Sequence, residues 1–366
     1  MSIDQTPSGF LDKTIQRARS AWQRMAGSEY DASAATLRPD LPKSDADRLK
    51  TQMQECLDAK GGEVSARVRA AALGHVYMAL DDSGKGKFLR ILAEDFDVDH
   101  EKVFDTASRL ATNKEGQDTL DIEMQLRNLL EAPRIKLLTQ FNAVPEGVKF
   151  LVDLRADLLP KTKTSSALKS LDDDIKSLFD LWFDIGFLEL RQITWDNSSA
   201  ALLEKLIAYE AVHEIKSWDD LKNRLDSDRR CYAFFHPRMP EEPLIFVEVA
   251  LVNGMAGNVQ DLLDENAPVQ DSAQADTAIF YSISNAQKGL AGISFGNFLI
   301  KRVVEHLSNE LPAIKNFATL SPIPGFVTWL EKAITSGEKG VLSVNEHKAL
   351  NALGEGGRGA KGKLLE

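Results

Sequence analysis

Cysteine and histidine are scarce in this sequence. Cys56 and Cys231 are the two cysteines among 366 residues, and they are too few and too far apart to suggest a disulfide framework or a metal site. The chain has six histidines, and no pair of them has the spacing of metal ligands. These absences argue against a disulfide-stabilised secreted protein and against a metal enzyme, and they fit a reducing compartment.

Long hydrophobic runs are also lacking. The best candidate, Pro243 to Val252, is short and is interrupted by Glu248, so we predict no membrane span and no membrane partner. The N-terminus has no apolar core of the signal-peptide kind, and Asp4 and Asp12 are atypical of a transit peptide. We therefore expect a cytoplasmic protein.

Positive charge is in deficit. Lys and Arg number 44 against 55 Asp and Glu, which gives a formal net charge of -11. This balance argues against nucleic acid as the main partner, and an anionic ligand would need a local positive site. A hydrophobic content of 43% in a chain of this length is sufficient for two domains with sizeable cores.

Two domains are predicted from the change in pattern along the chain. Residues 1–185 show helical periodicity without strand-like alternation, which predicts an all-α domain. From residue 186 onward, strands mixed with helices predict an α+β catalytic domain over 186–366.

Polar breaks within the helical part predict its connections. The sequence DDSGKG from Asp81 is typical of a turn. The segment Lys161 to Ser170 is rich in Lys, Thr and Ser and is predicted as a linker or exposed loop. Ser170 with Asp173 resembles a capping box for the next helix.

The stretch from Ala278 to Trp329 has the most informative order of elements. An apolar run typical of a buried strand is followed by a turn with glycines at 289, 292 and 296. The helix after this turn places four apolar residues on one face: Phe295, Leu299, Val303 and Leu307. A second strand ends before Ser321, where two prolines fix the backbone.

The glycine turn has two interpretations. Glycine lets the backbone approach a ligand closely, and the start of the helix offers unpaired N–H groups that favour a phosphate. Glycines in loops also commonly serve packing alone. The nearby cations also have two interpretations. The side chains of Lys288, Lys301 and Arg302 could contact the phosphates, or they could form a solvated helix face.

Three strings in the second half resemble the malonyl-CoA decarboxylase family. They are HPRMPEEPLIFVEVALVNG from His236, FYSIS with QKGLAGISFGNFLIKRVV from Phe280, and LSPIPGF from Leu320 to Phe326. The resemblance implies a GNAT-like α+β catalytic domain that binds coenzyme A. It also implies a helical N-terminal domain that mediates homo-oligomer contacts.

The resemblance assigns the substrate malonyl-CoA to the glycine turn. In the GNAT superfamily the coenzyme A pyrophosphate binds at a Q/R-x-x-G-x-G/A pattern, which Ala291 and Ser294 match only in degenerate form. The substrate-binding residues that the resemblance implies are Ala291, Gly292, Ile293, Ser294, Phe295, Gly296 and Asn297.

Ser321 matches the family's catalytic serine. Loss of CO2 from malonyl-CoA leaves a thioester enolate, so the site needs donors for the oxyanion and a proton for the carbon. The Ser321 hydroxyl could bind the departing carboxylate or relay the proton. The resemblance implies no metal and no organic cofactor, because the thioester carbonyl itself accepts the electrons.

The family's general acid is a histidine well downstream of LSPIPGF, and no matching motif follows Trp329. His347 lies in different surroundings, so the role is not assigned to it. The catalytic domain is therefore predicted to be truncated at its C-terminus. The alternative to a decarboxylase is a truncated or inactive homologue that binds coenzyme A thioesters or pairs with other subunits, and a generic acetyltransferase is a third option.

Overall fold

The computed structural model describes residues 37–59, 62–113, 119–295, 298–323 and 325–336, with single positions or pairs up to 346. The chain divides into two compact units, Met1–Ala318 and Thr319–Glu366. Each unit is described by itself below.

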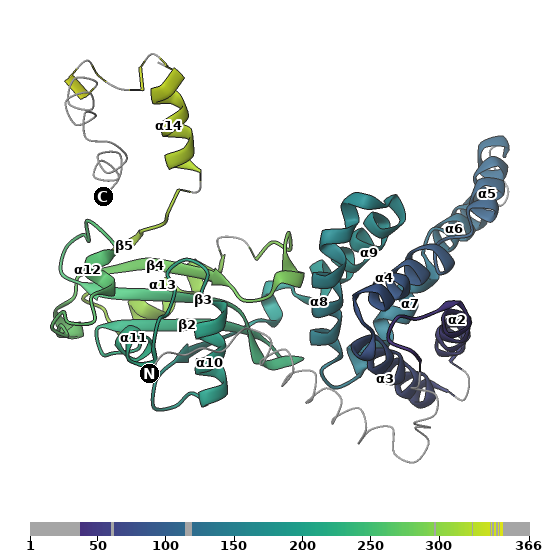
Figure 1. The fold of residues 1–366 in the computed structure, drawn as a ribbon, viewed down its shortest axis with the longest axis horizontal. Helices are drawn as coiled ribbons and strands as arrows, with labels where there is room; N and C mark the ends of the chain where they lie inside the picture. The colour runs from purple at the N-terminus through teal and green to yellow at the C-terminus, as the bar shows by residue number, and fades with distance from the viewer. Residues whose placement is uncertain are drawn as a thin grey trace. The chain divides into compact units, whose positions relative to one another are not determined.

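The first part of the first unit is helical (Figure 1). Its helices are α2 Lys43–Leu57, α3 Glu63–Ala79, α4 Asp82–Arg90, α5 His100–Thr112, α6 Thr119–Leu129, α7 Pro133–Gln140, α8 Gly147–Leu158 and α9 Ser166–Trp182. A π-helical turn, Ile91–Asp95, follows α4, and 3-10 turns cover Phe141–Ala143, Leu159–Thr164 and Ile185–Phe187. Among the described residues no strand precedes Glu189, which confirms the predicted all-α region.

The turn predicted at DDSGKG is wrong, because α4 begins at Asp82. The Asp81 carboxylate accepts a hydrogen bond from the Gly84 N–H at 2.8 Å and caps the helix. A Cβ at Gly84 would lie 2.1 Å from the Pro39 carbonyl oxygen. Glycine is therefore present there because a neighbouring backbone packs against the helix, not because the chain turns.

The linker predicted from Lys161 to Ser170 is also wrong. This segment is a 3-10 turn that leads into α9, and Ser165 caps α9 by accepting from the Leu168 N–H. The predicted cap, Ser170, lies inside the helix, where its hydroxyl accepts a hydrogen bond from Arg134 at 2.9 Å. The polar composition of this segment therefore does not indicate a loop, because Ser165 and Ser170 form hydrogen bonds within the helical region.

The second part of the first unit contains a sheet of five strands in the order β1-β2-β3-β4-β5 (Figure 1). The strands are β1 Glu189–Ile193, β2 Arg229–His236, β3 Met239–Val252, β4 Thr277–Asn285 and β5 Asn316–Thr319. Pairing from β1 to β4 is antiparallel. The N–H groups of Lys315 and Asn316 donate to the Asp276 carbonyl, so β5 begins beside the start of β4.

Helices occur in three of the four connections between the strands of the sheet, and β2 joins β3 through a short turn. α10 Ala200–Tyr209 and α11 Trp218–Arg224 lie between β1 and β2, α12 Gln260–Leu263 lies between β3 and β4, and α13 Phe298–Glu310 lies between β4 and β5. The helical region followed by a mixed α and β region confirms the predicted fold class.

The central strands alternate their side chains between two cores. Val247 and Val249 point into the larger core, which also contains residues of the helical region. The predicted apolar face of α13 is confirmed, since its buried residues are Leu299, Val303 and Leu307. Phe246 and Cys231 point into a smaller core formed with α10 and α11. Each fully buried aliphatic side chain contributes roughly 1.5–3 kcal/mol.

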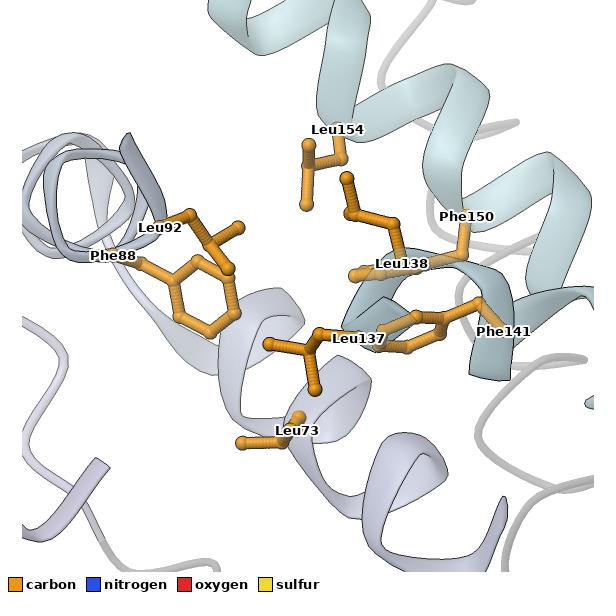
Figure 2. Close-up of a pocket in the computed structure, with 8 residues that line it drawn as sticks. All are labelled: Leu73, Phe88, Leu92, Leu137, Leu138, Phe141, Phe150 and Leu154. Carbon is orange, nitrogen blue, oxygen red and sulfur yellow. The ribbon is translucent and has the colours of Figure 1, made fainter. Parts of the chain in front are cut away.

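A small apolar cavity lies in the core of the helical region (Figure 2). Its volume is about 10 Å³, and it is lined by Leu73, Phe88, Leu92, Leu137, Leu138, Phe141, Phe150 and Leu154. The lining offers no hydrogen-bond partner to a water molecule, so we expect the cavity to stay dry.

Candidate active site

The glycine turn after β4 contains a tight reverse turn from Leu290 to Ile293. The Ile293 N–H donates to the Leu290 carbonyl at 3.0 Å. Ala291 has φ -55° and ψ 129°, and Gly292 has φ 77°. These angles define a type II turn, which requires glycine at its third position because φ is positive there.

Two glycines of this segment serve different purposes. Gly289 is buried, and a Cβ there would lie 1.8 Å from the carbonyl oxygen of Val152 on α8. Gly292 is exposed, and a Cβ there would meet nothing within 4 Å. The packing interpretation therefore holds at Gly289. At Gly292, glycine is required by the positive φ, and the space beside it is open.

Backbone donors are available on the exposed side of the turn. Within the described part of the chain, the N–H groups of Gly292, Ser294 and Phe295 have no recorded acceptor. Ala291, Gly292 and Ser294 are exposed. N–H groups without an acceptor near a residue with positive φ are suited to an anion.

The predicted substrate-binding residues are thus only partly surface residues. The side chains of Ile293 and Phe295 are 8% and 7% exposed and belong to the larger core. They anchor the turn, and only their backbone could contact a ligand. Gly296 and Asn297 lie outside the described residues.

Ser321 belongs to the second unit. It is exposed and lies in the connection from β5 to helix α14, Phe326–Ser336. In this connection the Phe326 N–H donates to the Ile323 carbonyl. The prediction that Ser321 follows the end of a strand is correct, and its catalytic role stays a prediction.

The three cations near the turn differ in their surroundings. The Arg302 guanidinium donates to the Leu188 carbonyl at 2.8 Å and lies 5.9 Å from the centre of the Phe234 ring. It has a structural role and is not directed to a ligand. Lys288 and Lys301 are exposed.

Sequence reasoning missed the residue that holds the turn from behind. Arg155 of α8 is 2% exposed, and its Nη1 donates to the Gly289 and Ala291 carbonyls at 2.6 and 2.9 Å. Its Nε donates to Asp172 of α9 at 2.8 Å. A charged residue among the apolar positions of α8, four residues after Leu151, was the signal available in the sequence.

A second missed group is a buried ionic network on the smaller-core face of the sheet. Arg224 of α11 is 3% exposed and donates to Asp220 at 2.7 Å and to Glu248 of β3 at 3.1 Å. Burial raises the pKa of Glu248 to about 8, although the Arg224 charge opposes this change. Its other charged neighbours, Glu210 and Asp220, are both negative.

A β-bulge adjoins this network. Glu248 is opposite Ser282 and Val249 is opposite Phe280, so Tyr281 has no partner residue on β3. The Nε2 of His213 lies 3.2 Å from the Tyr281 carbonyl oxygen. The bulge thus frees a backbone carbonyl that a side chain satisfies.

Among the residues that the structure describes, no group of three or more acidic, histidine or cysteine side chains is arranged to hold a metal ion. Both cysteines are buried and free. In the same part of the chain, no helix has the length and apolarity that crossing a membrane requires. The fold and the turn together define an α+β protein with an exposed glycine turn after strand β4.

Comparisons with known proteins identify the family. Residues 96–183 match the family model of the malonyl-CoA decarboxylase N-terminal domain, and residues 186–363 match that of the malonyl-CoA decarboxylase C-terminal domain. The chain is 35% identical to mitochondrial malonyl-CoA decarboxylase of Anser anser anser over 341 residues, which cover 89% of this chain and 66% of that protein. It is 39% identical to the Mus musculus protein of the same name, with 68% and 52% covered.

Solved structures agree with this result. The crystal structure of malonyl-CoA decarboxylase from Rhodopseudomonas palustris has a TM-score of 0.76 and 41% identity, with 84% of this chain and 74% of that chain covered. The structure from Agrobacterium vitis has a TM-score of 0.75 and 38% identity, with 87% and 77% covered. The chain belongs to the malonyl-CoA decarboxylase family. It spans between about half and two thirds of the length of the goose and mouse relatives.

Proposed function

We propose that the protein decarboxylates malonyl-CoA to acetyl-CoA and CO2. The observation that carries this proposal is the pair of family matches, over residues 96–183 and 186–363, since the second match includes both the glycine turn and Ser321. In the reaction the bond from the methylene carbon to the carboxylate breaks, its electron pair passes into the thioester as an enolate, and a proton is added to the carbon.

The glycine turn is the proposed site for the phosphates of coenzyme A. The N–H groups of Gly292, Ser294 and Phe295, which have no acceptor among the described residues, would supply donors without any charged side chain, which suits a protein with a net charge of -11. Hydrogen bonds from backbone N–H groups to an anion are stronger than those between neutral groups. The exposed Lys288 is available to add positive charge beside the turn.

Ser321 is proposed as the catalytic residue, either as a binder of the departing carboxylate or as a relay for the proton. We propose that the reaction uses no metal and no organic cofactor, because the thioester carbonyl accepts the electrons.

Ser321→Ala tests this assignment. Turnover is measured as acetyl-CoA formed from malonyl-CoA, and coenzyme A affinity is measured by calorimetry. We expect turnover to fall by about 10²–10⁴-fold, the contribution of a positioned proton-transfer group, while affinity is retained. Ser336→Ala is the matched control, because the Ser336 hydroxyl bonds only within its own helix in the described structure. Unchanged turnover in Ser321→Ala would refute the role of Ser321.

A second candidate function is binding of coenzyme A thioesters, or pairing with other subunits, without turnover. Tight coenzyme A binding by the unsubstituted chain without any acetyl-CoA formation would establish this second function in place of the first.

We further propose that the protein forms homo-oligomers through its helical region and resides in the cytoplasm. Large exposed apolar side chains on α5 and α6 support the first point, since Phe104, Leu120 and Met124 are 72%, 76% and 60% exposed. Light scattering of the purified protein would detect an oligomer, and Phe104→Lys should shift the mass toward the monomer.

A further inference from the structure

We propose that Arg155 is a positioning residue for the coenzyme A site. In this inference, Arg155 selects the type II form of the turn at Ala291 and Gly292 and so directs the Gly292 N–H toward a phosphate. The inference rests on the proposed function, because that function places the coenzyme phosphates at this turn.

The peptide between Ala291 and Gly292 links the two sides of the turn. A trans peptide is planar, and its C=O and N–H point in opposite directions. Arg155 Nη1 holds the Ala291 carbonyl oxygen at 2.9 Å, on the buried side. The N–H of Gly292 in the same peptide is therefore directed to the opposite side, where Gly292 is exposed.

Without Arg155 this peptide has an alternative orientation. Type I and type II turns share the bond from the fourth residue to the first, and they differ by a flip of the central peptide. A flip would turn the Ala291 carbonyl outward and the Gly292 N–H inward. An outward carbonyl would repel a phosphate, so the orientation of one peptide decides whether the turn attracts or repels an anion.

The rest of the structure fixes Arg155 itself. Its Nε donates to Asp172, a buried carboxylate that is 6% exposed. The same Nη1 also holds the Gly289 carbonyl at 2.6 Å, and Gly289 is in close contact with Val152 on α8, one turn before Arg155. The guanidinium thus joins two helices to the turn, and a flexible ammonium could not reproduce this geometry.

Arg155→Lys tests the proposal against a matched control, Arg134→Lys. Arg134 is also a buried arginine, 1% exposed, and it donates to Asp174 of the same helix α9 at 2.6 Å. Its other side-chain partners are Asp97, the Ala93 carbonyl and the Ser170 hydroxyl. It is therefore as buried as Arg155 and is also paired with carboxylates, but among the described residues it makes no hydrogen bond to the turn.

Affinity is measured by calorimetry for coenzyme A and for pantetheine, which lacks the diphosphate. We expect Arg155→Lys to raise the Kd for coenzyme A about tenfold, corresponding to about 1.4 kcal/mol. The Kd for pantetheine should stay unchanged. Arg134→Lys should leave both Kd values unchanged while losing similar thermal stability. Wild-type coenzyme A affinity in a folded Arg155→Lys variant, or an equal loss for pantetheine, would overturn the proposal.

Gly292→Ala provides a second variant that keeps Arg155. The new Cβ meets nothing within 4 Å, so the substitution acts only on the backbone, whose φ of 77° disfavours alanine. We expect it to weaken coenzyme A binding and to spare pantetheine, as in Arg155→Lys. Undiminished coenzyme A binding would show that the turn form is not required, and the proposal would fail.

A measurement without ligand separates this inference from the proposed function. In a type II turn the Ala291 Hα lies close to the Gly292 amide proton, and this contact lengthens in type I. NMR should show a strong NOE between these protons in the unsubstituted chain and a weak one in Arg155→Lys. If the unsubstituted chain fails to bind coenzyme A, the proposed function fails and the ligand role of Arg155 fails with it. An NOE unchanged in Arg155→Lys would refute the selection of the turn by Arg155 whether or not coenzyme A binds.

Discussion

The helical region and the smaller-core face of the sheet each bury an arginine, but the charges around the two differ. Arg155 has one buried carboxylate, Asp172, and uses its remaining recorded bonds for backbone carbonyls. Arg224 has two buried carboxylates, Asp220 and Glu248. The first arrangement is neutral and fixes a backbone. The second pairs one cation with two carboxylates, and burial raises the pKa of Glu248 to about 8.

The largest expected effect breaks the network on the sheet. Arg224→Met removes the cation from two carboxylates that are 4% and 2% exposed, Asp220 and Glu248. We expect a loss of about 3–5 kcal/mol in the free energy of unfolding, because the buried Asp220 carboxylate loses its cation and the buried Glu248 loses a hydrogen-bond donor. Urea unfolding monitored by circular dichroism measures it. Arg238→Met, at an exposed position, is the control and should change stability by less than about 0.5 kcal/mol.

A loss for Arg224→Met no larger than that for Arg238→Met would mean that the network does not stabilise the fold. Arg155 and Arg224 would then differ only in the geometry of their contacts.

A smaller effect tests whether Glu248 is protonated in the folded protein. The pKa of Glu248 is about 8 in the folded chain against an ordinary value of 4.5, so folding takes up a proton between these pH values. Stability from this group is therefore fully present below pH 4.5 and is lost as pH rises toward 8. Glu248→Gln should remove up to about 1.4 kcal/mol of this decline per pH unit.

Unfolding free energies at several pH values between 5 and 8 measure this difference. Glu189→Gln, an exposed carboxylate 2.6 Å from Arg191, should keep the wild-type slope. A slope in Glu248→Gln equal to that of the unsubstituted chain would mean that Glu248 is ionised in the folded protein, and the two regions would then bury charge in the same way.

The smallest expected effect concerns the apolar part of the helical region. Leu138 lines the cavity (Figure 2), whereas Leu171, equally buried, does not. Overpacking usually costs about 1–3 kcal/mol, and the cavity should absorb part of the added volume. Leu138→Phe should therefore cost less than Leu171→Phe, by about 1 kcal/mol. Equal losses would mean that the cavity cannot accept a larger side chain.

Sequence patterns predicted the elements that depend on local periodicity. The apolar spacing of Leu299, Val303 and Leu307 predicted the buried face of α13, and the β-branched and aromatic run before the turn predicted β4. The resemblance to the family was confirmed by the matches over both parts of the chain. The roles of Ser321 and of the turn residues stay predictions.

Features that depend on distant partners were not predictable. The segment from Lys161 was predicted as a linker because its polar residues have no apolar pattern, yet the hydroxyl of Ser170 is bound by Arg134, 36 positions away. Arg155 reaches Gly289 across 134 positions. Composition and spacing describe neighbours along a helix, whereas these contacts arise only when elements distant in the sequence pack together.

The close contact of Gly289 with α8 has a consequence for cutting the chain into pieces. The two family matches meet between residues 183 and 186, which invites separate expression of the second segment. That segment would carry the turn but not Val152 or Arg155, and the apolar side chains of Leu290 and Ile293 would lose part of their cover. The two segments match separate family models, but the hydrogen bonds that hold the turn form only when both are present.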